Sequence, residues 1–312
     1  MKVNQSTVML HSYVKIALLV LIPLISNAQL IQLNTPFVLN RNMINPSYDG
    51  ALDFHQFDFF MGSKQKWNGV VPGAPTVNVF HAMAKFTDKH SVGIQLIEHN
   101  FATFNYKAFA IPYSFTAKIN DNHSFKLGLS PRFIQSTIDF SNAITEMTIE
   151  PAKDDYSRLT LFIDATAGIS YHYKNRIKIG ASMSNFLVNG SANDPDMLNY
   201  SQYSILQGLF DVQYVMLENN ISQVSIDALC VTNGTLSPSI QAYVTGSKKF
   251  SNAAALMAIG YKSTGELVTI IRLQMPKFYY LYSYEIPISG NQLSTFTGNY
   301  VGLGYRFGAL RN

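Results

Sequence analysis

The feature that most constrains this chain is a long alternation of apolar and polar residues with a period of two. From Arg158 to Lys174 every second residue is apolar or aromatic, beginning at Leu159 and ending at Tyr173, and the residues between are polar or small, with Phe162 the sole exception. Successive side chains of a strand point to opposite faces, so the segment predicts one apolar and one polar face. Strands of globular sheets usually have about five or six residues, far fewer than this segment.

The same pattern recurs along the chain and predicts an all-β protein. Short polar links such as Asn120-Asp121-Asn122 and Lys174-Asn175-Arg176 are typical of hairpins between antiparallel strands. Fourteen candidate strands lie near residues 54–63, 76–86, 90–99, 104–119, 123–136, 158–173, 177–188, 200–217, 221–232, 237–245, 252–261, 265–274, 278–287 and 299–307. The longest connections are Thr137–Ser157, Asn189–Asn199 and Ser289–Thr297. Short turns alternating with long loops are the layout of an outer-membrane barrel.

Two architectures fit this alternation. A secreted β-sandwich turns its apolar face inward, whereas a transmembrane barrel turns it to lipid and its polar face to the lumen. Charged residues make up 13% of the chain, about half the roughly 25% of an ordinary soluble domain. Low charge, long strands and aromatics near strand ends favour an antiparallel transmembrane outer-membrane β-barrel of about 14 strands over residues 54–312. The candidate interfacial aromatics are Tyr171, Tyr173, Phe278, Tyr279, Tyr280, Tyr282, Tyr284 and Tyr305.

Residues 1–28 are expected to be a secretory signal peptide. Two lysines accompany the apolar run Ile16–Ile25, and the small residues Ser26 and Ala28 suit a cleavage site after Ala28. The run is shorter than the roughly 20 residues that cross a bilayer as a helix. Gln29 stands where a lipoprotein would need a cysteine, and Cys230 is the sole cysteine, so the chain can form no internal disulfide.

The segment between the signal and the first strand, residues 29–53, is longer than a simple leader and rich in turn residues. We expect it to be either a plug in the lumen or a periplasmic lead-in. Removal of the two signal lysines leaves 21 basic against 19 acidic side chains. This near balance predicts no broad basic surface, so we expect no nucleic-acid partner.

The sequence contains no recognisable motif for catalysis, cofactor binding or metal binding. The histidines form neither a His-Glu-x-x-His motif nor a pair at i, i+4, and no phosphate-binding loop or nucleophile elbow occurs. We therefore expect a non-enzymatic protein with a structural polar interior. Carboxylates of the polar faces, Asp164, Asp227, Glu266 and Glu285, are candidates to pair across a lumen with Lys126, Arg132, Arg158, Arg272 and Arg306.

An ordered series of motifs resembles the PorP/SprF family of type IX secretion membrane proteins. Asn45-Pro46-Ser47-Tyr48-Asp49-Gly50 comes first, and Lys64-Gln65-Lys66-Trp67 and Pro75-Thr76 follow. Asp164–Gly168, Ile179–Phe186 and Tyr282–Glu285 resemble later strands of the family. The candidate motif residues are Asn45, Pro46, Tyr48, Gly50, Lys64, Trp67, Pro75 and Thr76.

The sequence departs from the family pattern at four of these positions. Ser47, Lys64, Lys66 and Glu285 stand where the family has another small residue, an arginine, a glutamine and an aspartate. Lysine lacks the planar fork of arginine, so Lys64 cannot make a bidentate contact.

The resemblance implies an outer-membrane component of type IX secretion and gliding motility in a Bacteroidetes-type bacterium. The implied partners are outer-membrane lipid, a secreted adhesin-type cargo with a C-terminal sorting domain, and periplasmic secretion components. Long loops on a rigid scaffold commonly carry recognition, so Thr137–Ser157 is the first candidate contact with cargo, through Glu146, Glu150, Lys153, Asp154 and Asp155. The alternative is a porin-like solute channel lined by the five basic residues of the polar faces.

Overall fold

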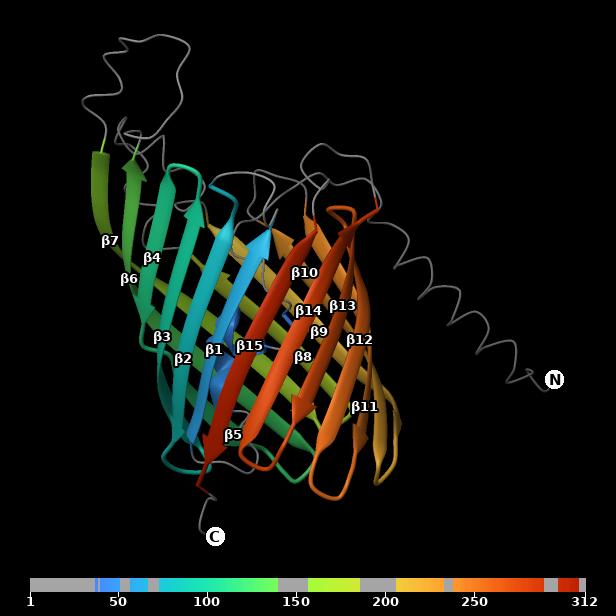
Figure 1. Ribbon diagram of the computed structural model, residues 1–312. Helices are drawn as coiled ribbons and strands as arrows, with labels where there is room; N and C mark the ends of the chain where they lie inside the picture. The colour runs from blue at the N-terminus through green and yellow to red at the C-terminus, as the bar shows by residue number, and fades with distance from the viewer. Residues whose placement is uncertain are drawn as a thin grey trace, which may run out of the picture.

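The computed structural model describes residues 37–38, 40–50, 57–66, 73–139, 157–185, 206–232, 238–288 and 297–308, almost all of them in one antiparallel sheet (Figure 1). Two short 3-10 helices come first, η2 (Arg41–Met43) and η3 (Pro46–Gly50). No helix within these ranges is long and apolar enough to cross a membrane. The strands are β1 (Phe57–Lys66), β2 (Thr76–Lys85), β3 (His90–Phe101), β4 (Phe104–Ala110), β5 (Tyr113–Lys118), β6 (His123–Asp139), β7 (Ser157–Tyr173), β8 (Ile177–Ser184), β9 (Gln207–Glu218), β10 (Ser222–Thr232), β11 (Ser239–Lys249), β12 (Ala254–Lys262), β13 (Glu266–Gln274), β14 (Phe278–Pro287) and β15 (Gly298–Phe307).

The sheet closes on itself into a barrel. β1 pairs with β2 on one side and with β15 on the other. β4 and β5 share one position in the ring, because both lie between β3 and β6 and pair with different parts of those strands. The ring therefore has 14 strand positions, which confirms the predicted strand number. Closure leaves the ring without the open edges of a sandwich sheet.

The predicted strand 104–119 is interrupted at Ile111 and Pro112. Proline has no N–H to donate to a ladder, and the Pro112 carbonyl accepts a hydrogen bond from the Gly93 N–H at 2.8 Å. Pro131 lies opposite on β6, and its carbonyl accepts from the Ile111 N–H at 3.1 Å. Two prolines on neighbouring strands thus weaken the ladder at one level, and the chain passes from β4 to β5 within the same position of the ring.

Some strand boundaries differ from the predicted ones. β8 ends at Ser184 instead of continuing to residue 188. Asn185 has a φ of 63°, which a strand does not accommodate. Its N–H donates to Asp164 Oδ2 at 3.0 Å, and its side-chain oxygen accepts from Arg132 at 2.6 Å. These contacts with neighbouring strands end β8, and a single-sequence pattern does not contain them.

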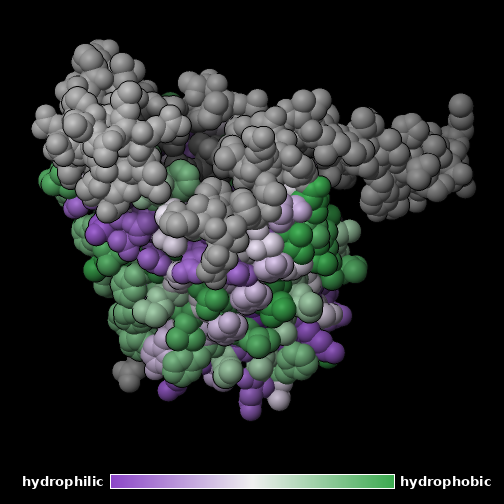
Figure 2. All heavy atoms as spheres, turned by 45° about the horizontal axis from the view of Figure 1, so that its top comes forward, coloured by the Kyte–Doolittle hydropathy of each residue, from purple (hydrophilic) through white to green (hydrophobic). Residues whose placement is uncertain are grey.

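The outward face of the sheet is apolar and the inward face is polar, the reverse of a soluble protein. Apolar residues that point outward are exposed, among them Leu161 at 70% and Ile259 at 60%. Polar residues that point inward are buried, and Asp164 and Asp227 are 0% exposed. Figure 2 shows apolar side chains over much of the visible wall. An apolar wall around a closed polar interior suits lipid, so the barrel prediction is confirmed and the soluble sandwich is excluded.

The two ends of the barrel differ in their connections. At one end, β2–β3, β5–β6, β7–β8, β9–β10, β11–β12 and β13–β14 are joined by turns of three or four residues. At the other end, wide intervals such as 140–156 and 185–206 separate consecutive strands. Outer-membrane barrels have short periplasmic turns and longer extracellular loops. We therefore call the short-turn end periplasmic and the other end extracellular; the extracellular end is at the top of Figure 1.

Aromatic rings gather on the outer wall near the periplasmic end. Close ring pairs there are Phe57–Phe307, Phe278–Tyr305, His123–Tyr173 and Phe125–Tyr171. Such rings suit a membrane interface, where one edge is wet and the rest is apolar. Tyr279 does not belong to this group, contrary to expectation. It is 5% exposed, faces the lumen and donates a hydrogen bond to Asp58 at 2.9 Å, because alternate residues of β14 face inward.

Candidate functional site in the barrel lumen

Residues 37–38 and 40–50 lie inside the barrel, and we call them the inner segment (blue in Figure 1). Asn40 donates a hydrogen bond to the Tyr300 hydroxyl of β15 at 3.2 Å, and Asn42 bonds His81 of β2 at 2.6 Å. Phe37 is 0% exposed and packs in an apolar cluster contributed by strands β9 to β13. The inner segment therefore contacts strands on several sides of the lumen.

The turn at Asn45 docks on the walls of β7 and β8. Asn45 Nδ2 donates to the carbonyl of Ile169 at 3.3 Å and to the carbonyl of Ala181 at 3.2 Å. Asn45 Oδ1 accepts from the Ser47 N–H at 3.0 Å. The carboxamide uses both kinds of hydrogen-bonding group, and neither an aspartate nor an apolar residue can make the same set. Asn45 thus joins the inner segment to two strands and orders its own turn.

Three glycines on adjacent strands make room for this turn, and we call Gly128, Gly168 and Gly180 the glycine seat. Gly128 and Gly168 are direct cross-strand partners on β6 and β7, and Gly180 lies on β8. A Cβ on Gly128 would overlap the backbone of Pro46 and Ser47, and one on Gly168 would overlap the Asn45 carboxamide. The backbone of the inner segment approaches the wall so closely that only residues without a side chain fit.

Arg41 joins the inner segment to the adjoining part of the wall, strands β9 and β10, by two ion pairs. Its Nη1 lies 2.7 Å from Asp211 Oδ2 on β9, and its Nη2 contacts Asp227 Oδ1 on β10. The other oxygen of Asp227 accepts hydrogen bonds from Ser225 Oγ at 3.1 Å and Thr245 Oγ1 at 3.0 Å. Both carboxylates are almost fully buried. Buried charges need such pairing and hydrogen bonding to offset the cost of leaving water.

Tyr48 adds an uncharged donor to the same site. Its hydroxyl donates to Asp211 Oδ2 at 2.7 Å, and the Arg41 guanidinium lies 5.7 Å from its ring centroid. Burial, with the Asp211 carboxylate beside it, raises the pKa of the Tyr48 phenol above its ordinary value. The hydroxyl therefore stays protonated and remains a donor. We call Arg41, Tyr48, Asp211 and Asp227 the arginine site.

A second buried group, the lysine cluster, consists of Lys64, Lys66, Lys262, Glu266 and Glu285. Glu285 Oε1 lies 2.6 Å from Lys64 Nζ and 2.6 Å from Lys262 Nζ. Lys66 Nζ lies 2.7 Å from Glu266 Oε1. These contacts connect β1 with β12, β13 and β14 on the lumen side. Lys64 makes a single contact with its carboxylate, as expected for lysine at this position.

The basic residues predicted to line a lumen are found there where they are described. Arg132 pairs with Asp164, and Arg306 Nε lies 2.8 Å from Asp58 Oδ2. The Arg272 guanidinium lies 4.5 Å from the Tyr279 ring centroid, and Lys126 is buried on the lumen face. The side chain of Arg158 lies outside the described residues. Asp227, Glu266 and Glu285 pair with Arg41 and the three lysines of the lysine cluster, partners that the alternation pattern did not identify.

A small cavity lies beside the inner segment. It has a volume of about 60 Å³ and lies between this segment and the wall, lined by residues that include Met43, His99, Arg132 and Gln207. About 10–15 Å³ of such space holds one water, so this cavity admits a few waters.

Several predicted motif residues converge in this site. Asn45, Pro46 and Tyr48 contact the wall directly, and Lys64 lies in the lysine cluster. Gly50 closes η3. The Pro75 carbonyl, next to Thr76 at the start of β2, accepts a hydrogen bond from the Lys66 N–H at 3.0 Å. Trp67 and the loop residues Glu146, Glu150, Lys153, Asp154 and Asp155 lie outside the described residues.

The arrangement is suited to holding a segment in place. Among the described residues, no group of three or more histidine, cysteine or acidic side chains is placed to bind a metal ion. The polar groups of the arginine site bond one another and the walls, and the glycine seat receives the protein's own backbone.

Comparison with solved structures finds hydrocarbon channels of similar architecture. The toluene transporter TbuX of Ralstonia pickettii has a TM-score of 0.54 at 9% identity, covering 85% of this chain and 93% of TbuX. The monoaromatic hydrocarbon channel CymD scores 0.53 at 8% identity, with 85% and 92% covered. The Pseudomonas putida toluene transporter TodX scores 0.50 at 8% identity, with 85% and 93% covered. At these identities the likeness concerns the fold alone.

The family comparison is more specific. No curated protein matches the chain at a significant level. The family described as "Type IX secretion system membrane protein PorP/SprF" matches residues 25–307, which include the inner segment and every strand of the barrel. This match agrees with the motif series around Asn45 and Lys64 and with the apolar outer wall. The chain belongs to the PorP/SprF family of type IX secretion system membrane proteins and is an outer-membrane β-barrel.

Proposed function

We propose that this type IX secretion component is a closed, non-conducting barrel that supports the export or surface attachment of a secreted adhesin-type cargo. The observation that carries the proposal is the segment anchored inside the lumen. The inner segment is held by the glycine seat and the arginine site, and a cavity of about 60 Å³ remains beside it. A solute pore needs an open path, whereas a scaffold that presents loops does not.

In this proposal, residues 29–53 act as a plug. The part of this segment that lies in the lumen has two kinds of anchor, close backbone packing on glycines and buried ion pairs. Both kinds restrict movement, since an ion pair removed from water is costly to break. The alternative role, a periplasmic lead-in, would leave these lumen contacts without a purpose.

The cargo is proposed to bind at the extracellular end. The loop between β6 and β7 is the first candidate, since both strands are long and end on that side. Its candidate contacts remain Glu146, Glu150, Lys153, Asp154 and Asp155, a mainly acidic set. Loops on a rigid barrel can vary in sequence without disturbing the scaffold, which suits recognition of one particular cargo.

The route to the membrane and the remaining partners complete the proposal. We infer export through the inner membrane by a signal peptide cleaved after Ala28, and contact with periplasmic components of the secretion and gliding apparatus at the short-turn end. No catalytic step is part of this function, since the family is one of secretion-system membrane proteins.

Two measurements test the proposal. The purified protein in planar bilayers should give no steady conductance, and deletion of the gene should remove one adhesin from the cell surface while others remain displayed. A variant whose loop has its four acidic residues changed to amides (E146Q, E150Q, D154N, D155N) should fold normally and display less of the same adhesin. A steady open pore would support the solute channel instead, and full display of all adhesins would refute the cargo role.

A further inference from the structure

The outer wall of the barrel has a hollow where a barrel wall is ordinarily convex. The hollow has a volume of about 1230 Å³ and is lined by strands β15, β1, β2, β3, β4, β6 and β7. Neighbouring strands lie about 4.8 Å apart, so seven strands give it a width of roughly 29 Å. The side chains of this outer hollow point away from the lumen.

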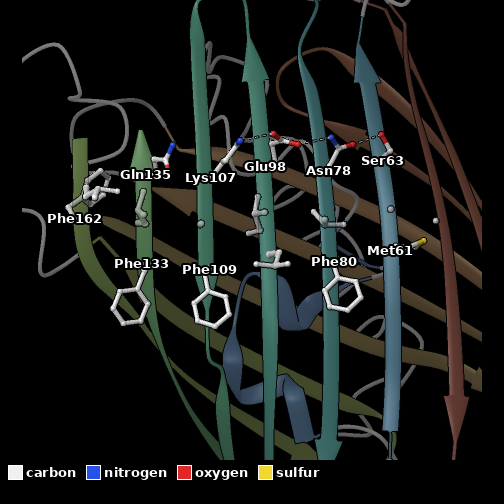
Figure 3. Close-up of a pocket in the computed structure, with 18 of the residues that line it drawn as sticks. Met61, Ser63, Asn78, Phe80, Glu98, Lys107, Phe109, Phe133, Gln135 and Phe162 are labelled. Carbon is white, nitrogen blue, oxygen red and sulfur yellow. Dashed lines mark hydrogen bonds and ion pairs between the residues drawn. The ribbon is translucent and has the colours of Figure 1, made fainter. Parts of the chain in front are cut away.

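The lower part of the outer hollow is an apolar row that runs across the strands. Met61, Phe80, Leu96, Phe109, Phe133 and Ile163 are successive cross-strand partners and all point outward. Figure 3 shows the rings of Phe80, Phe109 and Phe133 at one level. Leu96 and Phe133 are exposed at 46% and 49%. This row suits acyl chains.

A polar row lies directly above the apolar row, one outward position nearer the extracellular end. It consists of Ser63, Asn78, Glu98, Lys107 and Gln135, again successive cross-strand partners. Ser63 Oγ donates to Asn78 Oδ1 at 2.8 Å, Asn78 Nδ2 donates to Glu98 Oε2 at 3.2 Å, and Lys107 Nζ lies 3.5 Å from Glu98 Oε1 (Figure 3). Outward residues of one strand are about 6.6 Å apart, so the change from apolar to polar is abrupt.

A second polar row continues above the first one. Its members, again outward cross-strand partners, are Gln65, Thr76, Asn100, Asn105 and Thr137. On β8, β11, β12 and β13 the outward residue nearest the extracellular end is apolar or aromatic, namely Met183, Ile240, Tyr261 and Leu267, whereas β10 ends with the outward Thr232. The two polar rows, which cross five strands, therefore distinguish this part of the wall from β8 and from β11 to β13.

The chemistry of the two polar rows identifies the ligand class. Eight of the ten side chains are amides or hydroxyls, which bond sugar hydroxyls and amide-linked chains through both donors and acceptors. Lys107 is 53% exposed and has three donors, of which one lies toward Glu98, so it can also bind a phosphate. The width of the apolar row accommodates several acyl chains side by side.

We propose that the outer hollow binds a phosphorylated glycolipid of the outer leaflet, with its acyl chains on the apolar row and its sugar-phosphate head on the polar rows. A phospholipid has two chains and no sugar, so it uses only part of this surface. A second protein or another copy of this chain is the competing occupant.

The test is lipid retention by the purified full chain, measured by native mass spectrometry with added lipid A as the probe. Wild type should retain one lipid A per barrel. L96W fills the apolar row and should abolish retention, whereas K107Q should weaken retention about tenfold, as expected for a lost charge-assisted contact. M257W on the far wall is the matched control and should bind like wild type, since Met257 is 63% exposed outside the hollow.

Heat-modifiable migration in gels shows whether each variant is folded. The proposal is overturned if folded wild type retains no lipid A, if phosphatidylethanolamine is retained equally well, or if L96W and K107Q retain as much as M257W. Co-purification of a membrane protein that L96W releases would assign the outer hollow to a protein partner instead. None of these outcomes bears on conductance or on adhesin display, so the proposed function is tested separately.

Discussion

Arg41 in the inner segment and Asp227 on β10 lie 186 residues apart in the chain and form an ion pair inside the lumen. The same guanidinium pairs with Asp211 of the neighbouring strand. One cation thus faces two buried carboxylates, and the Ser225 and Thr245 hydroxyls and the Tyr48 phenol supply the remaining hydrogen bonds. The pairing ties the inner segment to the wall next to the glycine seat, since Asp211 and Gly180 are cross-strand partners.

Replacing Arg41 by glutamine should lower the free energy of unfolding by about 3–5 kcal/mol, because two buried carboxylates lose their partner. The measurement is denaturant unfolding of the barrel in detergent micelles. The double variant R41Q/D227N should recover part of the loss, since it removes one of the unpaired charges. The cycle of single and double variants gives the interaction free energy between Arg41 and Asp227. Equal stability of R41Q and wild type would show that the inner segment does not depend on this pair.

The glycine seat makes a second prediction. Gly168→Ala adds a methyl group where the Asn45 carboxamide lies, so the inner segment must shift. Overpacking of this kind costs about 1–3 kcal/mol, and the readout is the thermal unfolding midpoint together with bilayer conductance. Gly246→Ala on β11 is the matched control, since nothing lies within 4 Å of its added Cβ. If both variants lose stability equally, the loss comes from replacing a glycine in a strand and not from a clash in the glycine seat.

The lysine cluster has three cations and two carboxylates, so its members should differ in their effects. Glu285 holds both Lys64 and Lys262 at 2.6 Å, and Glu285→Gln leaves three lysines with one carboxylate. We expect this change to cost about 3–5 kcal/mol. Lys64→Met balances the cluster and keeps the side-chain volume, so we expect a cost of about 1 kcal/mol.

The measurement is again denaturant unfolding in micelles, with both variants compared in the same detergent. A larger loss for K64M than for E285Q would mean that the charge count does not control this part of the lumen, and that the Lys64 side chain is needed for another contact.

The wall of this barrel was predictable because the facing of a strand residue depends on local periodicity alone. The alternation around Leu161 predicted an outward apolar face, and Leu161 is 70% exposed. The prediction for Tyr279 was wrong because it rested on aromatic clustering and ignored the alternation, which places this residue on the inward face.

The lumen site was only partly predictable. Asn45, Tyr48 and Lys64 were identified from the motif series, but their partners Ala181, Asp211 and Glu285 lie 136, 163 and 221 residues away. Strand periodicity predicts the face of the sheet on which each partner lies, but it does not predict which residue the partner contacts. The role of Gly168 was not predictable either. A glycine within a strand does not show in the sequence that another segment packs against it.

The membrane setting makes a final prediction that depends on depth. Ile259 points outward near the middle of β12 and is 60% exposed, whereas Leu273 is the last outward residue of β13 before its periplasmic turn and is 47% exposed. A lysine on the lipid face costs about 2–4 kcal/mol at mid-membrane and about 0–1 near an interface. Ile259→Lys should therefore lower the free energy of unfolding in lipid vesicles by about 2–4 kcal/mol, and Leu273→Lys by about 0–1. Urea titrations in vesicles of one lipid composition measure both. In a soluble protein an exposed isoleucine can become lysine at almost no cost, so equal and negligible effects at the two positions would contradict the lipid-facing wall.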